Sequence, residues 1–260
     1  MFRTSNPAMN PEIFAKSRSY GLADTMTLQG TVNKCFILFF LLMLTASWIW
    51  GQVMPSAPII WESGYAKANM GAAVGPYIML GLLGGFILAL VTVFKLPWAR
   101  FTAPAYALCE GLVLGGISAI FEQSYPGIVI QAVSLTFATL FCMLMVYKTG
   151  LIKVTNKFVM GLSAATGAIC LVYLGSWILG FFGIRMPFIY GNGPGGILFS
   201  FVVVGIAALN LILDFHIIEQ GAQSDAPKYM EWYGAFALMV TLIWLYIEIL
   251  RLLAKMRDRR

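Results

Sequence analysis

Long apolar segments alternate with short polar connections along most of the chain. Seven of these segments are long enough to cross about 30 Å of hydrocarbon as helices. None shows the apolar-polar alternation of a membrane-spanning β-barrel, and the short connections favour antiparallel neighbours. The pattern therefore predicts an all-α polytopic membrane protein, a seven-helix transmembrane bundle, with helices at 35–54, 71–94, 101–121, 128–147, 158–183, 196–218 and 233–253.

Glycines four residues apart fall in the second and third predicted helices. Small residues at this spacing let two helices approach closely. We expect close helix packing at these pairs, which are Gly71 with Gly75, Gly81 with Gly85, and Gly111 with Gly115.

The composition agrees with a membrane protein. Apolar residues make up 60% of the 260 residues and charged residues only 11%, whereas soluble domains are about 25% charged. The net charge of +6 lies mostly at segment ends, as in proteins that meet anionic lipid headgroups, and it forms no stripe for nucleic acid. We divide the chain into an N-terminal tail at 1–34, a single transmembrane helical domain at 35–253 and a basic C-terminal tail at 254–260.

Lysine and arginine residues predict a cytoplasmic N-terminus. They are frequent before the first helix and in the connections 95–100 and 148–157, and scarce in the alternate connections, and cytoplasmic loops carry this excess. Because the first apolar segment follows 34 mostly polar residues, we expect it to remain as an uncleaved anchor. The basic C-terminal tail conflicts with this topology, since seven full crossings would place it outside. Either the last segment is re-entrant, or its burial outweighs the charge.

No motif for a cofactor, a metal ion or a catalysed reaction stands out. The glycine-rich residues 190–196 lack the preceding strand and the Lys-Ser/Thr of a phosphate-binding loop. The last predicted helix has no lysine before Lys255, which counts against a retinal Schiff base and a photoreceptor. We expect no enzyme activity, no cofactor and no metal site. The cysteines, which have no metal-ligand spacing, are expected to be core residues: Cys35, Cys109, Cys142 and Cys170.

Acidic residues inside three predicted helices are the candidate functional groups. An acid at membrane depth costs about 3 kcal/mol, and a chain that keeps one usually uses it. Asp214 lies in the sixth predicted helix and Glu248 in the seventh. Glu110 lies near the midpoint of the third, where it either has a function or locks two helices by polar pairing. Its alternative is a protonated acid bonded to a backbone carbonyl.

Two further ionisable residues are secondary candidates. Glu122 follows the third predicted helix, and we interpret it as an interfacial acid. His216 is the single histidine and lies two residues after Asp214, so it points to a different helix face. It is either an interfacial histidine or a pH sensor.

Two stretches near the C-terminus resemble a known family. Residues 213–218 have the sequence Leu-Asp-Phe-His-Ile-Ile, and residues 235–246 the sequence Ala-Phe-Ala-Leu-Met-Val-Thr-Leu-Ile-Trp-Leu-Tyr. They are similar to Tyr-Asp-Thr-Gln-x-Ile and Ala-Leu-Ser-Leu-Tyr-Leu-Asp-Ile-Ile-Asn-Leu-Phe of the Bax inhibitor (transmembrane Bax inhibitor motif) family, especially its bacterial branch. Residues 249–253 and the pair 111–112 resemble the family too, and the likeness extends over most of the chain after Gly30.

The resemblance implies a proton-sensitive latch of two buried aspartates, one in each of the last two helices, that opens or closes a calcium-permeable path. Asp214 matches the first aspartate, whereas Thr241 stands at the second position. A threonine can hydrogen-bond Asp214 but cannot share a proton with it as a carboxylate can. Glu248 lies seven residues after Thr241, about 10 Å along the helix axis, which is too far to replace the acid directly. Phe215 and His216 replace the family's Thr-Gln.

We therefore expect a multipass protein of the bacterial inner membrane that acts as a pH-sensitive leak for calcium or other cations. Asp214 would change charge, assisted by Glu110 or Glu248, because a buried carboxyl group beside a second acid can titrate near physiological pH. The alternative is a non-conducting partner of a membrane protease or another membrane complex, which Thr241 favours. The expected partners are the lipid bilayer, calcium as the permeant ion and other membrane proteins, without nucleic acid.

Overall fold

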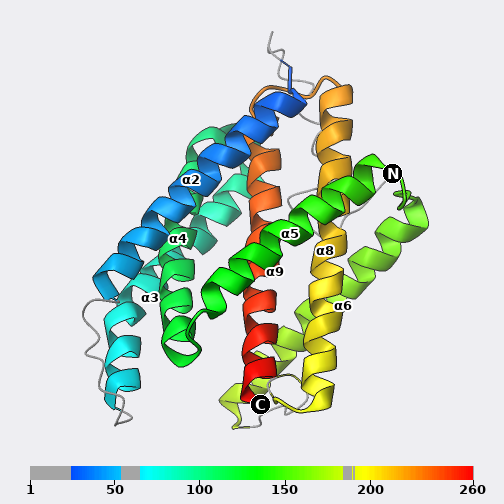
Figure 1. Cartoon of the computed structure of the whole chain (residues 1–260). Helices are drawn as coiled ribbons and strands as arrows, with labels where there is room; N and C mark the ends of the chain where they lie inside the picture. The colour runs from blue at the N-terminus through cyan, green and yellow to red at the C-terminus, as the bar shows by residue number, and fades with distance from the viewer. Residues whose placement is uncertain (1–24, 54–64, 184–188, 190, 260) are drawn as a thin grey trace. The chain divides into compact units, whose positions relative to one another are not determined.

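The computed structural model describes residues 25–53, 65–183, 189 and 191–259, with the backbone alone for 65–73. Over these residues the chain forms seven long α-helices and no strand (Figure 1). All seven are long and apolar enough to cross a membrane, which confirms the predicted all-α polytopic fold. The helices are α2 (Leu28–Val53), α3 (Tyr65–Phe94), α4 (Ala99–Ser124), α5 (Ile128–Lys148), α6 (Asn156–Phe181), α8 (Pro194–Gln223) and α9 (Met230–Asp258), with a short 3-10 turn, η2 (Leu96–Trp98), before α4.

Several helices extend beyond the apolar segments that predict them. Helix α2 begins at Leu28 and α9 continues to Asp258, because polar residues at the segment ends prolong the helical hydrogen bonding. Helix α9 is continuous from Met230, so it has the length of a full crossing. The predicted tail at 1–34 lies partly outside the described residues, and its role as a separate region stays a prediction.

The chain divides into two compact units, which are described separately below. Unit 1 contains α6, α8, the part of α5 from Ile130 and the part of α9 from Val240 onward. Unit 2 contains α2, α3, α4 and the part of α9 that precedes Val240.

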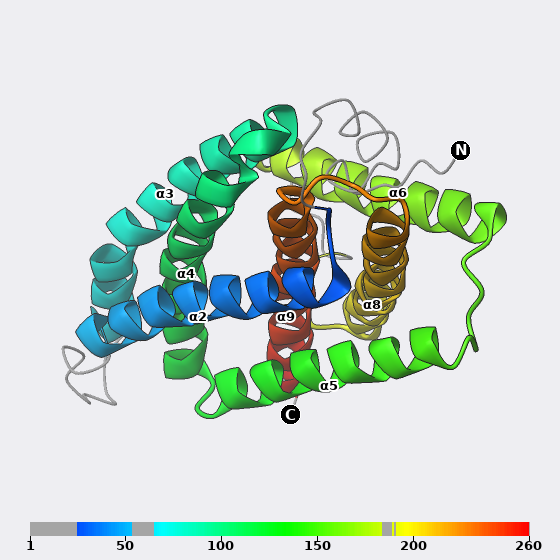
Figure 2. The ribbon, with the colours of Figure 1, turned by 90° about the horizontal axis from the view of Figure 1, so that it is seen from above.

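Unit 2 is packed through glycine residues. Helices α2 and α3 both lie against α4 (Figure 2). A Cβ atom at Gly81 would lie 2.6 Å from a carbonyl oxygen of α4, and one at Gly115 would lie 2.7 Å from a carbonyl oxygen of α2. Only glycine fits such contacts, so the predicted close packing is confirmed at both positions. A Cβ atom at Gly75 would have no described neighbour within 4 Å, so no close packing is seen there among the described residues.

Polar side chains connect the helices of unit 1. Helix α6 contacts α8, and the side-chain amide of Asn210 on α8 donates a hydrogen bond to Thr166 Oγ1 on α6 at 3.0 Å. The same amide also donates to the Ile206 carbonyl at 2.9 Å. Such bonds satisfy polar groups that lipid cannot hydrate.

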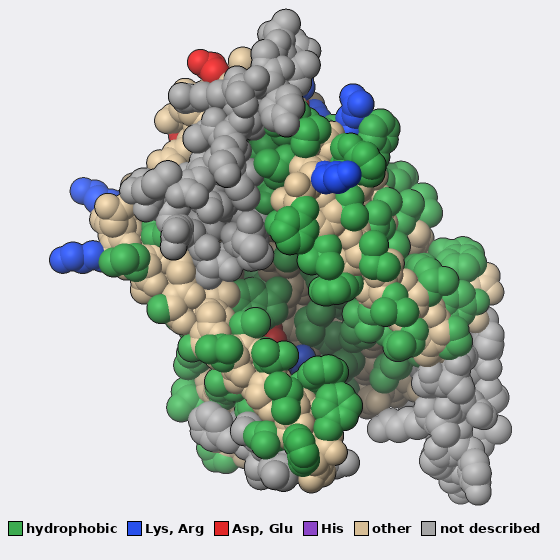
Figure 3. Space-filling view, turned by 180° about the vertical axis from the view of Figure 1, so that it is seen from behind, with side chains coloured by type: hydrophobic (Ala, Val, Ile, Leu, Met, Phe, Trp, Pro, Cys, Tyr) green, Lys and Arg blue, Asp and Glu red, His purple; other side chains and the backbone are tan. Residues whose placement is uncertain are grey.

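Large apolar side chains are exposed on every helix from α2 to α8, and Figure 3 shows many apolar side chains on one face. A soluble monomer rarely exposes contiguous apolar surface of this extent, whereas a membrane-spanning helix directs such residues to the lipid chains. Examples with more than three fifths of their surface exposed are Phe36, Phe86, Phe101, Phe141, Phe181 and Phe201.

Candidate functional site

Asp214 is buried in the second half of α8, within unit 1. Its exposed fraction is 1%, and the three residues before it in the helix are also buried. Thr241 on α9, in the same unit, is 4% exposed. The two positions that the family resemblance singles out are thus both closed to solvent. Burying an ionised carboxyl group is costly unless it is paired or hydrogen-bonded, so the charge of Asp214 is sensitive to its surroundings.

Glu248 is the second buried acid of unit 1, with 2% of its side chain exposed. The Tyr173 hydroxyl on α6 lies 3.0 Å from each carboxyl oxygen and donates a hydrogen bond to the carboxylate. Arg251, one turn later on α9, forms an ion pair with it at 3.1 Å. The Arg251 guanidinium also lies 5.2 Å from the centre of the Tyr173 ring. Glu248 is therefore ion-paired with Arg251 and connects α9 to α6 through Tyr173. Because its carboxylate is already bonded to these two residues, it is not available to share a proton with Asp214.

His216 belongs to a small cluster between α5 and α8 in unit 1. The Tyr147 hydroxyl donates a hydrogen bond to Glu219 and lies 3.4 Å from His216 Nδ1. The rings of Tyr147 and His216 meet edge to face. Glu219 could not be singled out from the sequence, because an acid near the end of a helix looks like an ordinary interfacial residue. His216 is thus grouped with a tyrosine and a second titratable residue.

Glu110 lies on α4, within unit 2, and is partly buried. Its hydrogen-bond partner is Tyr106, one turn earlier on the same helix. A Cβ atom at Gly85 of α3 would lie 3.1 Å from Glu110 Oε1, so this glycine makes room for the carboxyl group between two helices. The hydrogen bond to Tyr106 stays within α4, so the polar pairing of two helices through Glu110 stays a prediction.

Glu122 stabilises the turn between α4 and α5. Its carboxylate accepts hydrogen bonds from the backbone N–H groups of Gly127 at 2.5 Å and Val129 at 3.1 Å. These are the exposed donors at the start of α5, where a negative charge is favoured. Glu122 thus has a capping role in the structure, and its place as a secondary functional candidate stays a prediction.

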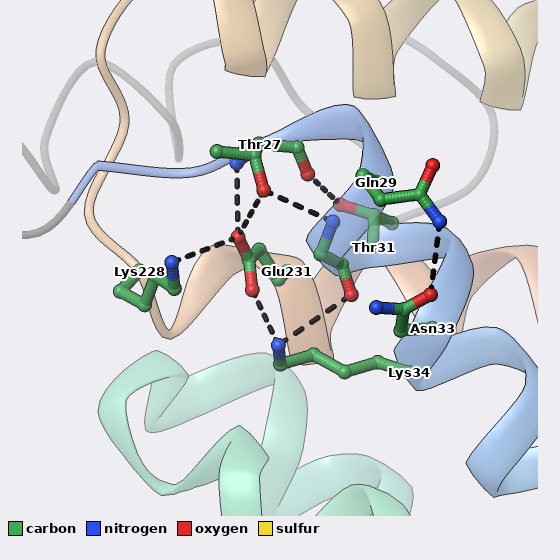
Figure 4. Close-up of polar contacts among 8 residues, drawn as sticks. Thr27, Gln29, Thr31, Asn33, Lys34, Lys228 and Glu231 are labelled. Carbon is green, nitrogen blue, oxygen red and sulfur yellow. Dashed lines mark hydrogen bonds and ion pairs between the residues drawn. The ribbon is translucent and has the colours of Figure 1, made fainter.

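Glu231 is a fully buried acid at the start of α9 that the sequence analysis missed. Its exposed fraction is 0%, and it forms ion pairs with Lys34 on α2 and with Lys228. Thr27 donates two hydrogen bonds to it, from N and from Oγ1, both at 2.9 Å (Figure 4). The backbone at Gly30 lies so close that a Cβ atom there would overlap the carboxylate. This cluster, the Glu231 cluster, joins the first turns of α2 and α9 within unit 2.

The acidic residues do not assemble a metal site. Among the described residues, no group of three or more His, Cys, Asp or Glu side chains lies close enough to hold an ion.

A family model described as Bax inhibitor 1 like matches residues 6–258, which is nearly the whole chain. The chain belongs to the Bax inhibitor 1 like family. No curated protein and no solved structure matches it. The resemblance inferred from residues near the C-terminus is thereby confirmed. With seven apolar helices, this Bax inhibitor 1 like protein is a multipass membrane protein.

Proposed function

We propose that this Bax inhibitor 1 like protein is a pH-sensitive leak for calcium or other cations in the bacterial inner membrane, with Asp214 as the group that changes charge. The observation that carries the proposal is the burial of Asp214 inside an apolar helix. Ionisable residues placed in this way mark ion or proton pathways in membrane proteins. Protonation would remove a charge from unit 1 and change the packing between α8 and α9.

We further propose a cytoplasmic N-terminus. The distribution of lysine and arginine over the connections supports this orientation. Seven crossings then place the C-terminus on the opposite side. The contacts at the end of α9 favour this arrangement, because Arg251 is paired with Glu248 and Lys255 is buried. Charges that are held inside the protein have less weight in deciding orientation than charges in an open loop.

The test is calcium flux into vesicles that contain the purified protein, measured at an acidic and at a neutral pH. The wild type is expected to give different rates at the two pH values. Asp214→Asn keeps the shape of the side chain but cannot titrate, so its flux should be equal at both. Asp225→Asn is the matched control, since Asp225 lies in the α8–α9 connection with a positive φ of 52°, which asparagine tolerates well.

If Asp214→Asn and the wild type share the same flux and the same pH dependence, Asp214 has no part in the mechanism. If Asp225→Asn alters the flux as much as Asp214→Asn does, the effect reflects a change of overall charge and does not support a buried sensor.

The second candidate function is a non-conducting partner of a membrane protease or another membrane complex. Thr241 favours it, because this buried residue occupies the position of the family's second aspartate and cannot hold a shared proton. A stoichiometric partner that co-purifies with the protein, together with no flux at either pH, would support this function and overturn the leak. Neither proposal assigns a catalytic residue.

A further inference from the structure

Lys255 is a buried cation in the last turn of α9. Its exposed fraction is 5%, and its ammonium group donates hydrogen bonds to three oxygen atoms. These are the Ile189 carbonyl at 2.5 Å, the Gly196 carbonyl at 3.1 Å and the Ser200 hydroxyl at 2.8 Å. The C-terminal end of a helix favours a positive charge, and all four residues belong to unit 1.

The oxygen atoms around Lys255 are all electrically neutral. Among the described residues, no carboxylate lies within ion-pair distance of its ammonium group. Arg251 and Glu248, whose charges act on it, have opposite signs and are paired with each other. The ammonium group of Lys255 is therefore bonded by carbonyl and hydroxyl oxygens, whereas that of Lys34 is bonded by the carboxylate of Glu231.

Neutral oxygens at these distances are typical ligands of a monovalent cation. Potassium channels replace the water around K⁺ with backbone carbonyl oxygens in the same way. Calcium prefers carboxylates among six to eight oxygen ligands at about 2.3–2.6 Å, which this group does not offer. The chemistry around Lys255 therefore selects an ion of the size and charge of K⁺ or an alkylammonium.

The oxygen atoms do not depend on Lys255 alone for their position. Asn192, in the connection that precedes α8, donates a hydrogen bond to Asp258 at the end of α9 at 2.8 Å. Gly196 and Ser200 lie in the first turns of α8, whose backbone is fixed by its own hydrogen bonds. Removing the lysine side chain should leave most of this group in place.

We propose that the Ile189, Gly196 and Ser200 oxygens form a binding site for a monovalent cation, which Lys255 occupies as a tethered cation and so closes to ions from solution. The proposal goes beyond the calcium leak, since it concerns a different group of atoms and a different ion. It is tested by thermal stability, so its outcome does not depend on whether the protein conducts.

The experiment compares full-length wild type, Lys255→Ala and Lys255→Met in detergent, in KCl, ethylammonium chloride or choline chloride at equal ionic strength. Lys255→Ala leaves space beside the three oxygens, whereas Lys255→Met fills that space with an uncharged chain of similar length. In KCl or ethylammonium chloride the Tm of Lys255→Ala should rise over its value in choline, by about 5 °C when the ion is a hundredfold above its Kd. The wild type and Lys255→Met should not respond.

A second substitution identifies the oxygens that bind the ion. Adding Ser200→Ala to Lys255→Ala removes one ligand and should reduce the rise in Tm. The absence of any Tm response in Lys255→Ala would overturn the proposal. Lys255 would then only connect α9 to the start of α8 by hydrogen bonds. An equal response in all three proteins, or a larger response to calcium chloride than to KCl, would also overturn it. If Lys255→Ala does not fold in choline, it is prepared in KCl or ethylammonium chloride, and failure in both salts contradicts the proposal.

Discussion

The two compact units differ in how closely glycine residues bring their helices together. In unit 2, Gly81 and Gly115 lie where the backbone of a neighbouring helix leaves no room for a side chain. In unit 1, a Cβ atom at Gly175 or Gly205 would meet no described atom within 4 Å. Helices of unit 1 are joined by hydrogen bonds between side chains, such as the one that Tyr173 on α6 donates to Glu248 on α9. Glycine thus serves as a contact surface at Gly81 and Gly115 of unit 2, but not at Gly175 or Gly205 of unit 1.

This difference in helix packing predicts that the glycine contacts of unit 2 are rigid, whereas the side-chain contacts of unit 1 can respond to a change of charge. Closely packed backbones tolerate little displacement, because protein interiors are dense and any shift creates clashes or voids. A hydrogen bond between side chains can be lost or exchanged when one partner changes its proton or its ion. We infer that the glycine contacts make the packing of α2 and α3 against α4 in unit 2 rigid, whereas Asp214 and Lys255 in unit 1 are buried groups that a proton or a cation can affect.

The largest expected effect comes from the Glu231 cluster in unit 2. Glu231→Gln keeps the size of the side chain but leaves the ammonium group of Lys34 without its ion pair. Breaking a buried pair by neutralising one partner costs about 3 kcal/mol or more. The free energy of unfolding in detergent should fall by this amount. Because the ion pair with Lys34 needs an ionised carboxylate, the loss of stability should appear at any pH at which Glu231 is ionised.

A double-mutant cycle supplies the control for Glu231. Lys34→Gln should be destabilising by itself, and combining it with Glu231→Gln should cost clearly less than the sum of the two. Additive effects would show that the pair is not coupled. A change below about 0.5 kcal/mol for Glu231→Gln would be the effect of an ordinary surface residue, and would contradict its role in joining α2 to α9.

Gly115→Ala and Gly175→Ala compare the two units directly with the same chemical change. At Gly115 the new methyl group would lie 2.7 Å from the carbonyl oxygen and 2.9 Å from the Cα atom of Ala46. Neither backbone atom can rotate away, so α2 must shift, at a cost of about 1–3 kcal/mol. At Gly175 the methyl group meets no described atom, and alanine favours the helix by up to about 1 kcal/mol. The unfolding midpoint of Gly115→Ala should therefore fall, whereas that of Gly175→Ala should rise or stay the same.

The outcome of this glycine pair tests the comparison itself. Equal losses of stability for both variants would show that α6 is packed through Gly175 as tightly as α4 is through Gly115. No loss for either would show that α2 and α4 adapt easily, and unit 2 would not be the rigid region.

The fold was predictable from the sequence because crossing a membrane requires a long apolar segment, and segment length is visible without tertiary contacts. Asp214 was predictable for the same reason, as an acid inside such a segment. The Glu231 cluster was not, because Glu231 and Lys34 are 197 residues apart and both lie at segment ends, where charges are ordinary. Lys255 was equally hidden, since two of its three partners are backbone oxygens that any sequence offers. The lengths of the apolar segments indicate which residues lie at membrane depth. They do not indicate which helix ends lie next to each other, and these two sites depend on that.

Tyr173→Phe in unit 1 should have the smallest effect of the three comparisons. The change removes the hydroxyl that donates to Glu248 but keeps the ring. The ion pair between Glu248 and Arg251, at 3.1 Å, remains, so the carboxylate keeps a charged partner. The expected loss is about 1 kcal/mol, the usual net value of one hydrogen bond. In an Arg251→Gln background the same change should cost more, because Glu248 would then lose both partners. A loss as large as that of Glu231→Gln would mean that unit 1 is held as rigidly as unit 2, and the distinction between them would fail.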